Sequence, residues 1–307
     1  MTVAPSSPGA PRPSFARIWW HAARPNTLPA ALAGVVVGLG AAYGSGAAFR
    51  PDTALGCVLV ALLLQVVANF ANDLSDFRRG ADTPDRKGPV RVAAAGLVTP
   101  RQLEVAIAIT IGLAGVVGLW LAVVGGPALI GLGVLAVVAA LAYTGGPWPY
   151  GYRGLGEVFV FIFFGLVAVI GTAYLQAGRI DPIFVAAAIP VGTLTTAILV
   201  VNNLRDIPTD RAAGKRTLAV TFGERWTQAE YAALVGAAFV VPVALVGAGR
   251  SWLLLATLLA LPMTLPLWRI VRGFGERREL NAVLKGTARL SLVVALLFAA
   301  GLAVGVR

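Results

Sequence analysis

Four polar side chains follow one another at helical spacing where a long apolar run ends. Asn69, Asn72, Asp73 and Asp76 occupy positions i, i+3, i+4 and i+7, one face of a helix that continues beyond the apolar run 53–68. Carboxylates stacked in this way repel each other unless a cation lies among them. Mg²⁺ prefers hard oxygen ligands and is usually bound by a few carboxylates together with substrate phosphates. The spacing therefore predicts a magnesium–diphosphate site.

A second polar cluster repeats this arrangement further along the chain, within VNNLRDIPTDRAAGKRTL (201–218). Asn202, Asp206 and Asp210 lie at i, i+4 and i+8, again on one helical face, and Gly214 is expected to end that helix. Each cluster ends an apolar run, so we expect the two sets of acids to converge on one pocket. The alternative is that these acids form ordinary ion pairs with nearby Arg and Lys. We favour the metal site because ionisable residues at membrane depth are costly and usually functional.

Basic residues are interleaved with both acid clusters and could contact phosphate oxygens directly. Positive charge that fixes loops on one side of a membrane is a competing explanation for some of them. The candidates for binding diphosphate are Arg78, Arg86, Arg91, Arg205 and Lys215.

The composition is that of a membrane protein. The chain has 307 residues, of which 58% are hydrophobic and 13% charged, and its mean hydropathy is +0.80; a soluble domain is typically about 25% charged. The net charge of +11 could suggest a nucleic-acid partner. However, the basic residues lie in short loops between apolar runs, as in the cytoplasmic loops of membrane proteins. A single cysteine, Cys57, excludes an internal disulfide and a cysteine-based zinc site.

The apolar runs predict an all-α polytopic protein with nine transmembrane helices. Residues 1–14, rich in Pro and Ser, are expected to form a disordered tail, and residues 15–307 a single transmembrane domain. The predicted spans are 26–44, 53–72, 102–123, 127–143, 156–176, 183–204, 228–248, 251–270 and 283–305.

The distribution of Lys and Arg predicts the orientation of these spans. If the N-terminus and the loops after the second, fourth, sixth and eighth spans share one side, only Arg50, Arg179, Arg250 and Arg307 remain for the other. The positive-inside rule then places the N-terminus in the cytoplasm and the C-terminus outside. Both acid clusters are thereby expected on the cytoplasmic side.

The two clusters resemble the signatures of the UbiA superfamily of intramembrane aromatic prenyltransferases, N-D-x-x-D at 72–76 and D-x-x-x-D at 206–210. Three longer stretches most resemble the branch that prenylates 1,4-dihydroxy-2-naphthoate in menaquinone synthesis: GADTPDRKGPVR (80–91), YTGGPWPY (143–150) and NNLRDIPTDRAAGKRTLAV (202–220). One position departs from the superfamily pattern. Gly80 stands where many members have a third acid, and Asp82 is its expected substitute, as in the menaquinone branch.

The resemblance implies a polyprenyltransferase with a central cavity that opens to the cytoplasmic side of a bacterial plasma membrane. It implies transfer of a polyprenyl chain from polyprenyl diphosphate to 1,4-dihydroxy-2-naphthoate with loss of CO₂, giving demethylmenaquinol and diphosphate. The expected partners are these two substrates and membrane lipid, without nucleic acid, and the expected cofactor is Mg²⁺. Asp73 and Asp76 would hold one ion, Asp206 and Asp210 another, and Asp82 would be a further ligand.

The implied acceptor, 1,4-dihydroxy-2-naphthoate, carries a carboxylate, so we expect a basic side chain to bind it. Arg24 at the head of the first span resembles the family's acceptor-side residues, although a charge that sets topology would also explain it. Tyr143 could shield a carbocation with its aromatic face or serve as an interfacial anchor. The other candidates for contact with the acceptor are Asn26, Asn69, Asn72 and Asn202.

A cation-coupled transporter is the alternative from a different class, since intramembrane acids and two similar halves also occur there. Against it, both acid clusters are predicted on one face of the membrane, where basic residues crowd them. Within the superfamily, the alternatives are other aromatic acceptors such as 4-hydroxybenzoate, and prenyl transfer of the haem and chlorophyll types.

Overall fold

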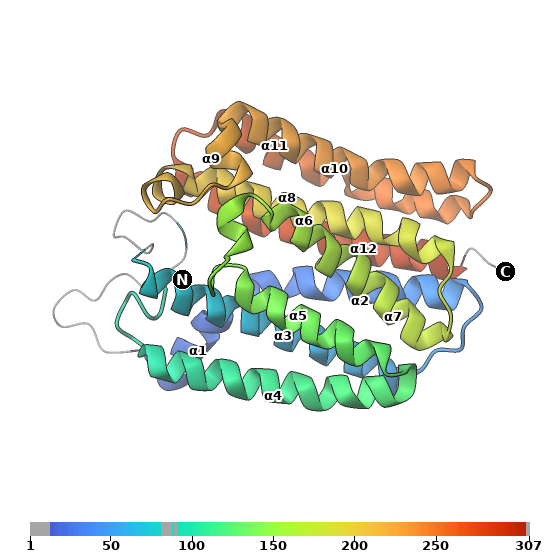
Figure 1. Ribbon diagram of the computed structural model, residues 1–307. Coiled ribbons are helices and arrows are strands. Elements are labelled where there is room, and N and C mark those ends of the chain that lie inside the picture. The colour runs from blue at the N-terminus through green and yellow to red at the C-terminus, as the bar shows by residue number, and fades with distance from the viewer. Residues whose placement is uncertain (1–12, 81–87, 89–90, 305–307) are drawn as a thin grey trace.

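The protein is a bundle of long helices whose connections gather at its two ends (Figure 1). A computed structural model describes residues 13–80, 88 and 91–304, and within that part of the chain no strand occurs. The helices are α1 (Phe15–Ala23), α2 (Leu28–Gly44), α3 (Pro51–Arg78), α4 (Pro100–Gly125), α5 (Ala128–Ala142), α6 (Gly156–Val160), α7 (Ala168–Ala177), α8 (Pro182–Ala212), α9 (Leu218–Phe222), α10 (Glu224–Gly247), α11 (Thr264–Gly273) and α12 (Leu280–Val304).

Short segments of other helical types join some of these elements. A π-helical segment, Phe161–Val167, makes α6 and α7 one continuous stretch, and a 3₁₀ segment, Trp252–Met263, leads into α11. Three shorter 3₁₀ turns are Pro25–Thr27, Tyr150–Arg153 and Arg277–Glu279.

The predicted multi-pass, all-α architecture is confirmed. Eight helical stretches in the described residues are long and apolar enough to cross a membrane. The predicted span 127–143 corresponds to α5, a shorter apolar helix of 15 residues. At 1.5 Å per residue it reaches about 22 Å, less than the ~30 Å of a hydrocarbon core.

The two helices that carry the acid clusters are the longest. α3 has 28 residues and α8 has 31, so they extend about 42 and 46 Å and exceed the hydrocarbon core. Both continue past the predicted membrane spans, which end at 72 and 204, as the helical spacing of the acids predicts. Each then ends in the same way, with a glycine at positive φ two residues after the helix: Gly80 at 65° and Gly214 at 72°.

α8 lies in the middle of the bundle, packed against α2, α10 and α12. Its Leu194, Val200 and Leu204 are fully buried in the largest hydrophobic cluster. α4 instead leaves Ile109, Leu113 and other large apolar side chains exposed. This contrast is what a membrane bundle requires, because an outer helix faces lipid while a central one faces mainly protein.

The space around glycine residues differs between the tightly packed helices and the outer ones. A Cβ atom on Gly34 of α2 would lie 2.6 Å from the Cβ of Ala168, and one on Gly165 would lie 2.7 Å from the Cα of Gly192 on α8. On α4, by contrast, a Cβ on Gly112 would have no atom within 4 Å. Small residues thus bring backbones together in the interior, as is typical of membrane helices.

We expect Gly40→Ala to lower the thermal unfolding midpoint of the detergent-solubilised protein. The new Cβ on α2 would lie 2.5 Å from the carbonyl oxygen of Ala299 on α12, so two backbones must separate; overpacking of this kind typically costs about 1–3 kcal/mol. The control is Gly115→Ala on α4, where no atom lies within 4 Å and alanine favours the helix. Equal midpoints for the two variants would contradict the close α2–α12 contact.

Candidate active site

The carboxylate of Asp76 lies at the end of α3 and accepts hydrogen bonds from three other segments of the chain. Its side chain is almost fully buried. Arg91 Nη2 lies 2.8 Å from Oδ2, while the hydroxyl of Tyr152 and Nζ of Lys215 lie 2.8 and 3.2 Å from Oδ1. A buried carboxylate needs such partners, because desolvation of a charge without compensation is very costly.

Asp73, one turn before the end of α3, holds the chain that returns after the first motif. Its carboxylate accepts hydrogen bonds from the main-chain N–H groups of Val92, at 3.1 Å, and Ala93, at 3.2 Å. These bonds fix the segment that follows Arg91, and thereby direct the Arg91 guanidinium toward Asp76. In the described structure Asp73 therefore organises the site as well as being a candidate metal ligand.

The second motif contains a buried ion pair between adjacent residues. Nε and Nη2 of Arg205 donate to the two carboxylate oxygens of Asp206, at 2.7 and 2.6 Å. The same guanidinium donates to Asn202 Oδ1 on α8 and to Asn281 Oδ1 on α12, both at 2.8 Å. Arg205 is only 1% exposed. Its donors are thus directed at protein groups that fix the end of α8 against α12.

Asp210, one turn after Asp206, shares a cation with the first motif. Because Gly214 adopts a left-handed conformation, the chain turns back and the Lys215 N–H donates to the carbonyl of Asp210 at 2.8 Å. Lys215 Nζ then lies 3.6 Å from Asp210 Oδ1 and 3.2 Å from Asp76 Oδ1. The structure therefore brings acids of both motifs, one on α3 and one on α8, to a single ammonium group.

Tyr152 was not predicted as a site residue. It lies in the turn Tyr150–Arg153 between α5 and α6, and its ring faces Lys215 Nζ at 4.6 Å and Arg79 Cζ at 5.4 Å from the centroid. Burial, with the nearby negative charge of Asp76, raises the pKa of the Tyr152 hydroxyl well above its usual range. The hydroxyl therefore stays protonated and donates to Asp76. The signal in the sequence is that Tyr152 follows the stretch YTGGPWPY (143–150) by two residues.

The candidate acceptor residue Arg24 lies at a sharp bend between α1 and α2. It has φ 52° and ψ 69°, a left-handed conformation that is strained for a non-glycine residue. Asn69 on α3 stabilises this bend, because its Nδ2 donates to the carbonyl of Ala23 at 2.9 Å and to Thr27 Oγ1 at 3.0 Å. The neighbouring Asn26 is exposed. Asn69 thus acts on the position of Arg24 through the backbone.

The other acceptor candidates lie near the two motifs. Asn72 Oδ1 accepts a hydrogen bond from Thr144 Oγ1 at 3.0 Å, next to Tyr143, whose ring packs edge-on against Tyr150 at 5.4 Å between centroids. Asn202 accepts from Arg205, as described above. Asn72 therefore links the first motif to the α5–α6 turn, and Asn202 belongs to the second motif's ion-pair network.

Three predicted residues remain. Arg78 is exposed and pairs with Glu104 on α4. Asp82 and Arg86 lie outside the described residues.

The donor set fits a divalent cation held with phosphates. Within residues 13–80, 88 and 91–304, no three His, Cys, Asp or Glu side chains form a ready metal cluster. Mg²⁺ does not need one, because it is commonly held by one or two carboxylates together with substrate phosphates. Asp76 and Asp210 supply such carboxylates, since they already surround one positive charge.

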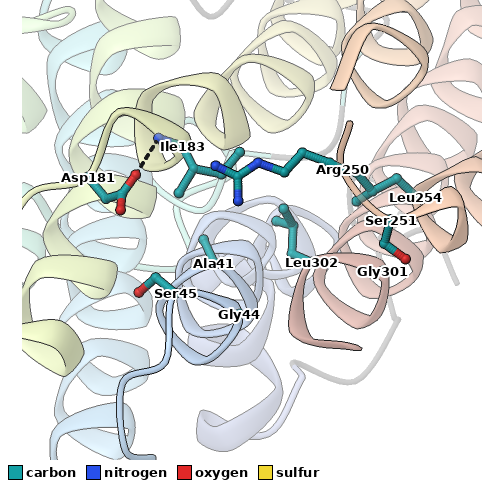
Figure 2. A pocket seen from close by; sticks show the side chains of 10 residues that line it. All are labelled: Ala41, Gly44, Ser45, Asp181, Ile183, Arg250, Ser251, Leu254, Gly301 and Leu302. Atoms are coloured by element: carbon teal, nitrogen blue, oxygen red, sulfur yellow. Dashed lines mark hydrogen bonds between the residues drawn. The ribbon is translucent and has the colours of Figure 1, made fainter. Parts of the chain in front are cut away.

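A small pocket at the other end of the bundle is not part of this centre. It has a volume of about 180 Å³ and lies among the ends of α2, α8 and α12, with Asp181 and Arg250 on its walls (Figure 2). Asp181 caps the first turn of α8, whereas Asp206 and Asp210 lie in its last turns. The length of α8 therefore separates this pocket from the acid motifs.

The chain is similar to known proteins over most of its length. Residues 31–293 match the model of the UbiA prenyltransferase family. The chain is 45% identical to the 1,4-dihydroxy-2-naphthoate octaprenyltransferase of Mycobacterium tuberculosis, covering 95% of this chain and 98% of that one. It is 38% identical to the enzyme of the same name from Escherichia coli, covering 94% and 96%.

Solved structures show the same fold. A UbiA homolog from Aeropyrum pernix K1 superposes with a TM-score of 0.69 at 19% identity, covering 91% of this chain and 97% of that one. A UbiA homolog from Archaeoglobus fulgidus bound to DMAPP and Mg²⁺ superposes with a TM-score of 0.62 at 16% identity, covering 93% and 99%.

We expect Arg205→Met to destabilise the protein severely, because it leaves Asp206 buried without its guanidinium. Removing one partner of a buried ion pair typically costs about 3–5 kcal/mol. The thermal unfolding midpoint in detergent measures the effect, and Arg211→Met, an exposed arginine on the same helix, is the control. If Arg205→Met kept the wild-type midpoint and only raised the KM for prenyl diphosphate, Arg205 would be a substrate ligand instead.

Proposed function

The chain belongs to the UbiA prenyltransferase family, and we propose that it transfers a polyprenyl chain from polyprenyl diphosphate to 1,4-dihydroxy-2-naphthoate. The prenyl group replaces the ring carboxylate, which leaves as CO₂, and the products are demethylmenaquinol and diphosphate. Bacterial relatives at 37–45% identity that carry the name 1,4-dihydroxy-2-naphthoate octaprenyltransferase support this substrate, since they match over nearly their whole length.

The observation that carries the proposal is the position of Lys215 Nζ between Asp76 on α3 and Asp210 on α8. Two acid motifs that share one cation can also share one diphosphate. Asp73, Asp76, Asp206 and Asp210 would hold Mg²⁺, with Asp82 as a further ligand. When bound, Mg²⁺ supplies positive charge that stabilises the departing diphosphate.

The basic side chains of the site act on the same leaving group. Arg91 and Lys215 are largely buried, with side chains 7% and 11% exposed, and ionic hydrogen bonds to phosphate are strong where water is excluded. Both already contact Asp76, so their donors lie beside the place where the diphosphate would bind. Arg78, Arg86 and Arg205 remain further candidates from the sequence.

The acceptor would bind on the Arg24 side of the site. The Arg24 guanidinium would receive the ring carboxylate, with the position of Arg24 set by the bond from Asn69 to the carbonyl of Ala23. The allylic carbon becomes positive as diphosphate departs, and the electron-rich ring carbon attacks it. The Tyr143 ring face would stabilise that positive charge, and Asn26, Asn72 and Asn202 would complete the acceptor side.

The proposed setting is the plasma membrane of a bacterium, with the N-terminus in the cytoplasm and the site facing the cytoplasm. The excess of Lys and Arg in the loops on one side supports this orientation. A central cavity opening to that side would receive the diphosphate, and the apolar tail would extend toward lipid. A transporter is less consistent with the fold, because both acid motifs lie at the same end of the bundle rather than at its middle.

Purified protein in detergent should convert polyprenyl diphosphate and 1,4-dihydroxy-2-naphthoate to demethylmenaquinol only when Mg²⁺ is present. We expect CO₂ and diphosphate to be released in equal amounts, as measured with a labelled carboxylate and a phosphate assay. Supplying 4-hydroxybenzoate in the same reaction tests the acceptor. If 4-hydroxybenzoate were consumed in preference, the acceptor assignment would fail, and if no diphosphate were released, so would the prenyltransferase itself.

Asp73→Asn and Asp206→Asn should each reduce turnover by roughly 10²-fold or more, because each loses negative charge from the metal–diphosphate site. The control is Asp52→Asn, which changes an exposed carboxylate at the opposite end of α3. Initial rates at saturating Mg²⁺ measure the effect. Near-normal turnover in either site variant would remove that residue from the metal ligands.

A further inference from the structure

Tyr152 joins three parts of the site that are far apart in the sequence. Its hydroxyl donates to Asp76 Oδ1 on α3 at 2.8 Å, and its main-chain carbonyl accepts from the N–H of Arg216, just after α8, at 2.8 Å. Tyr152 itself belongs to the turn between α5 and α6. A single residue thus ties the ends of the two motif helices together.

The ring of Tyr152 also contacts the cation shared by the motifs. Lys215 Nζ lies 4.6 Å from the ring centroid, 3.2 Å from Asp76 Oδ1 and 3.6 Å from Asp210 Oδ1. An aromatic face attracts an ammonium, most strongly where water is excluded. The ring and the two carboxylates therefore all contact the same ammonium group.

We propose that Tyr152 is a positioning residue that holds the Lys215 ammonium between Asp76 and Asp210, so that a divalent cation binds together with diphosphate rather than alone. This inference rests on the proposed function, since it concerns the same diphosphate site. It adds to that function a residue and an order of binding.

The order follows from charge balance. The ammonium already neutralises part of the charge of Asp76 and Asp210, so a divalent cation arriving alone must compete with it and then lies close to a like charge. A diphosphate arriving with the metal offers the ammonium new acceptor oxygens, so Lys215 then attracts the incoming complex. Metal and diphosphate should therefore each tighten the binding of the other by the same factor.

The experiment measures metal binding rather than turnover. Detergent-solubilised protein is dialysed to equilibrium against Mn²⁺, with and without inorganic pyrophosphate, and the excess Mn²⁺ in the protein chamber is counted. For the wild type we expect weak binding of Mn²⁺ alone and at least roughly tenfold tighter binding with pyrophosphate, a coupling within the usual range for linked sites.

Three substitutions should separate metal binding from diphosphate binding. Lys215→Met should bind Mn²⁺ alone more tightly than the wild type and lose most of the pyrophosphate effect. Tyr152→Leu should also tighten the binding of Mn²⁺ alone and reduce the pyrophosphate effect, because the Lys215 ammonium is no longer held in place. Tyr152→Phe, which keeps the ring and loses the hydroxyl bond, should show a smaller change.

The control is Tyr174→Phe, which also removes a half-buried hydroxyl bond, from Tyr174 to the carbonyl of Gly125 at 2.7 Å, at a different place in the bundle. It should leave both Mn²⁺ affinities unchanged. A purely structural role for Tyr152 predicts weaker or equal binding of Mn²⁺ alone, never tighter binding. If Tyr152→Leu does not fold, Tyr152→Phe and Lys215→Met carry the test.

The inference is overturned if Lys215→Met and the Tyr152 variants bind Mn²⁺ alone no more tightly than the wild type. Failure of the proposed function is a different result. In that case the wild type would bind no Mn²⁺ even with pyrophosphate, which would remove the metal–diphosphate site itself.

Discussion

Asp76 is 1% exposed at the end of a membrane helix, and a carboxylate in that position requires positive partners, because its desolvation is otherwise prohibitive. The chain supplies them from two directions. Arg91 comes from the segment after α3, and Lys215 from the segment after α8. This shared carboxylate therefore holds two distant loops at one end of the bundle, and it places two basic side chains at the proposed diphosphate site.

The two acid motifs pair their buried carboxylates with cations in different ways. Asp206 is paired with its own neighbour, Arg205, inside a network that reaches α12 through Asn281. Asp76 and Asp210 instead share Lys215 across two helices. A cation held by a long side chain between two carboxylates can move toward a phosphate, whereas a guanidinium fixed by several protein acceptors is held in place. The second motif thus has a rigid part and an adjustable part.

α3 connects the two halves of the proposed reaction. Asn69 supports the bend at Arg24 from the same helical face that carries Asp73 and Asp76. Asn69 and Asp76 are seven residues apart, about 10 Å along the helix axis. The acceptor side and the leaving-group side are therefore held at a fixed separation by a single rigid element, which favours the alignment that a displacement at carbon requires.

Hydrophobic periodicity and spacing determined much of this protein without a structure. The apolar runs predicted the multi-pass helical fold, and the i, i+4 spacing placed the acids of each motif on one helical face, because both properties depend on neighbours within a few turns. The same spacing placed the acids on helices that continue past the predicted membrane spans, which end at 72 and 204, and α3 and α8 do continue to Arg78 and Ala212. The predicted span 127–143 is present as α5, a shorter apolar helix of 15 residues.

Only the tertiary structure determines which basic side chain pairs with which carboxylate. Arg78, Arg205 and Lys215 are all candidates for diphosphate binding from the sequence, but packing directs Arg78 to Glu104, Arg205 to Asp206 and Lys215 to Asp76. Tyr152 went unnoticed because its partner Asp76 is 76 residues away, and Lys215 is 139 residues from the same carboxylate. Helical spacing is a local property that can be read from the order of the residues. These contacts, in contrast, exist only because the ends of α3 and α8 and the α5–α6 turn lie together in the fold.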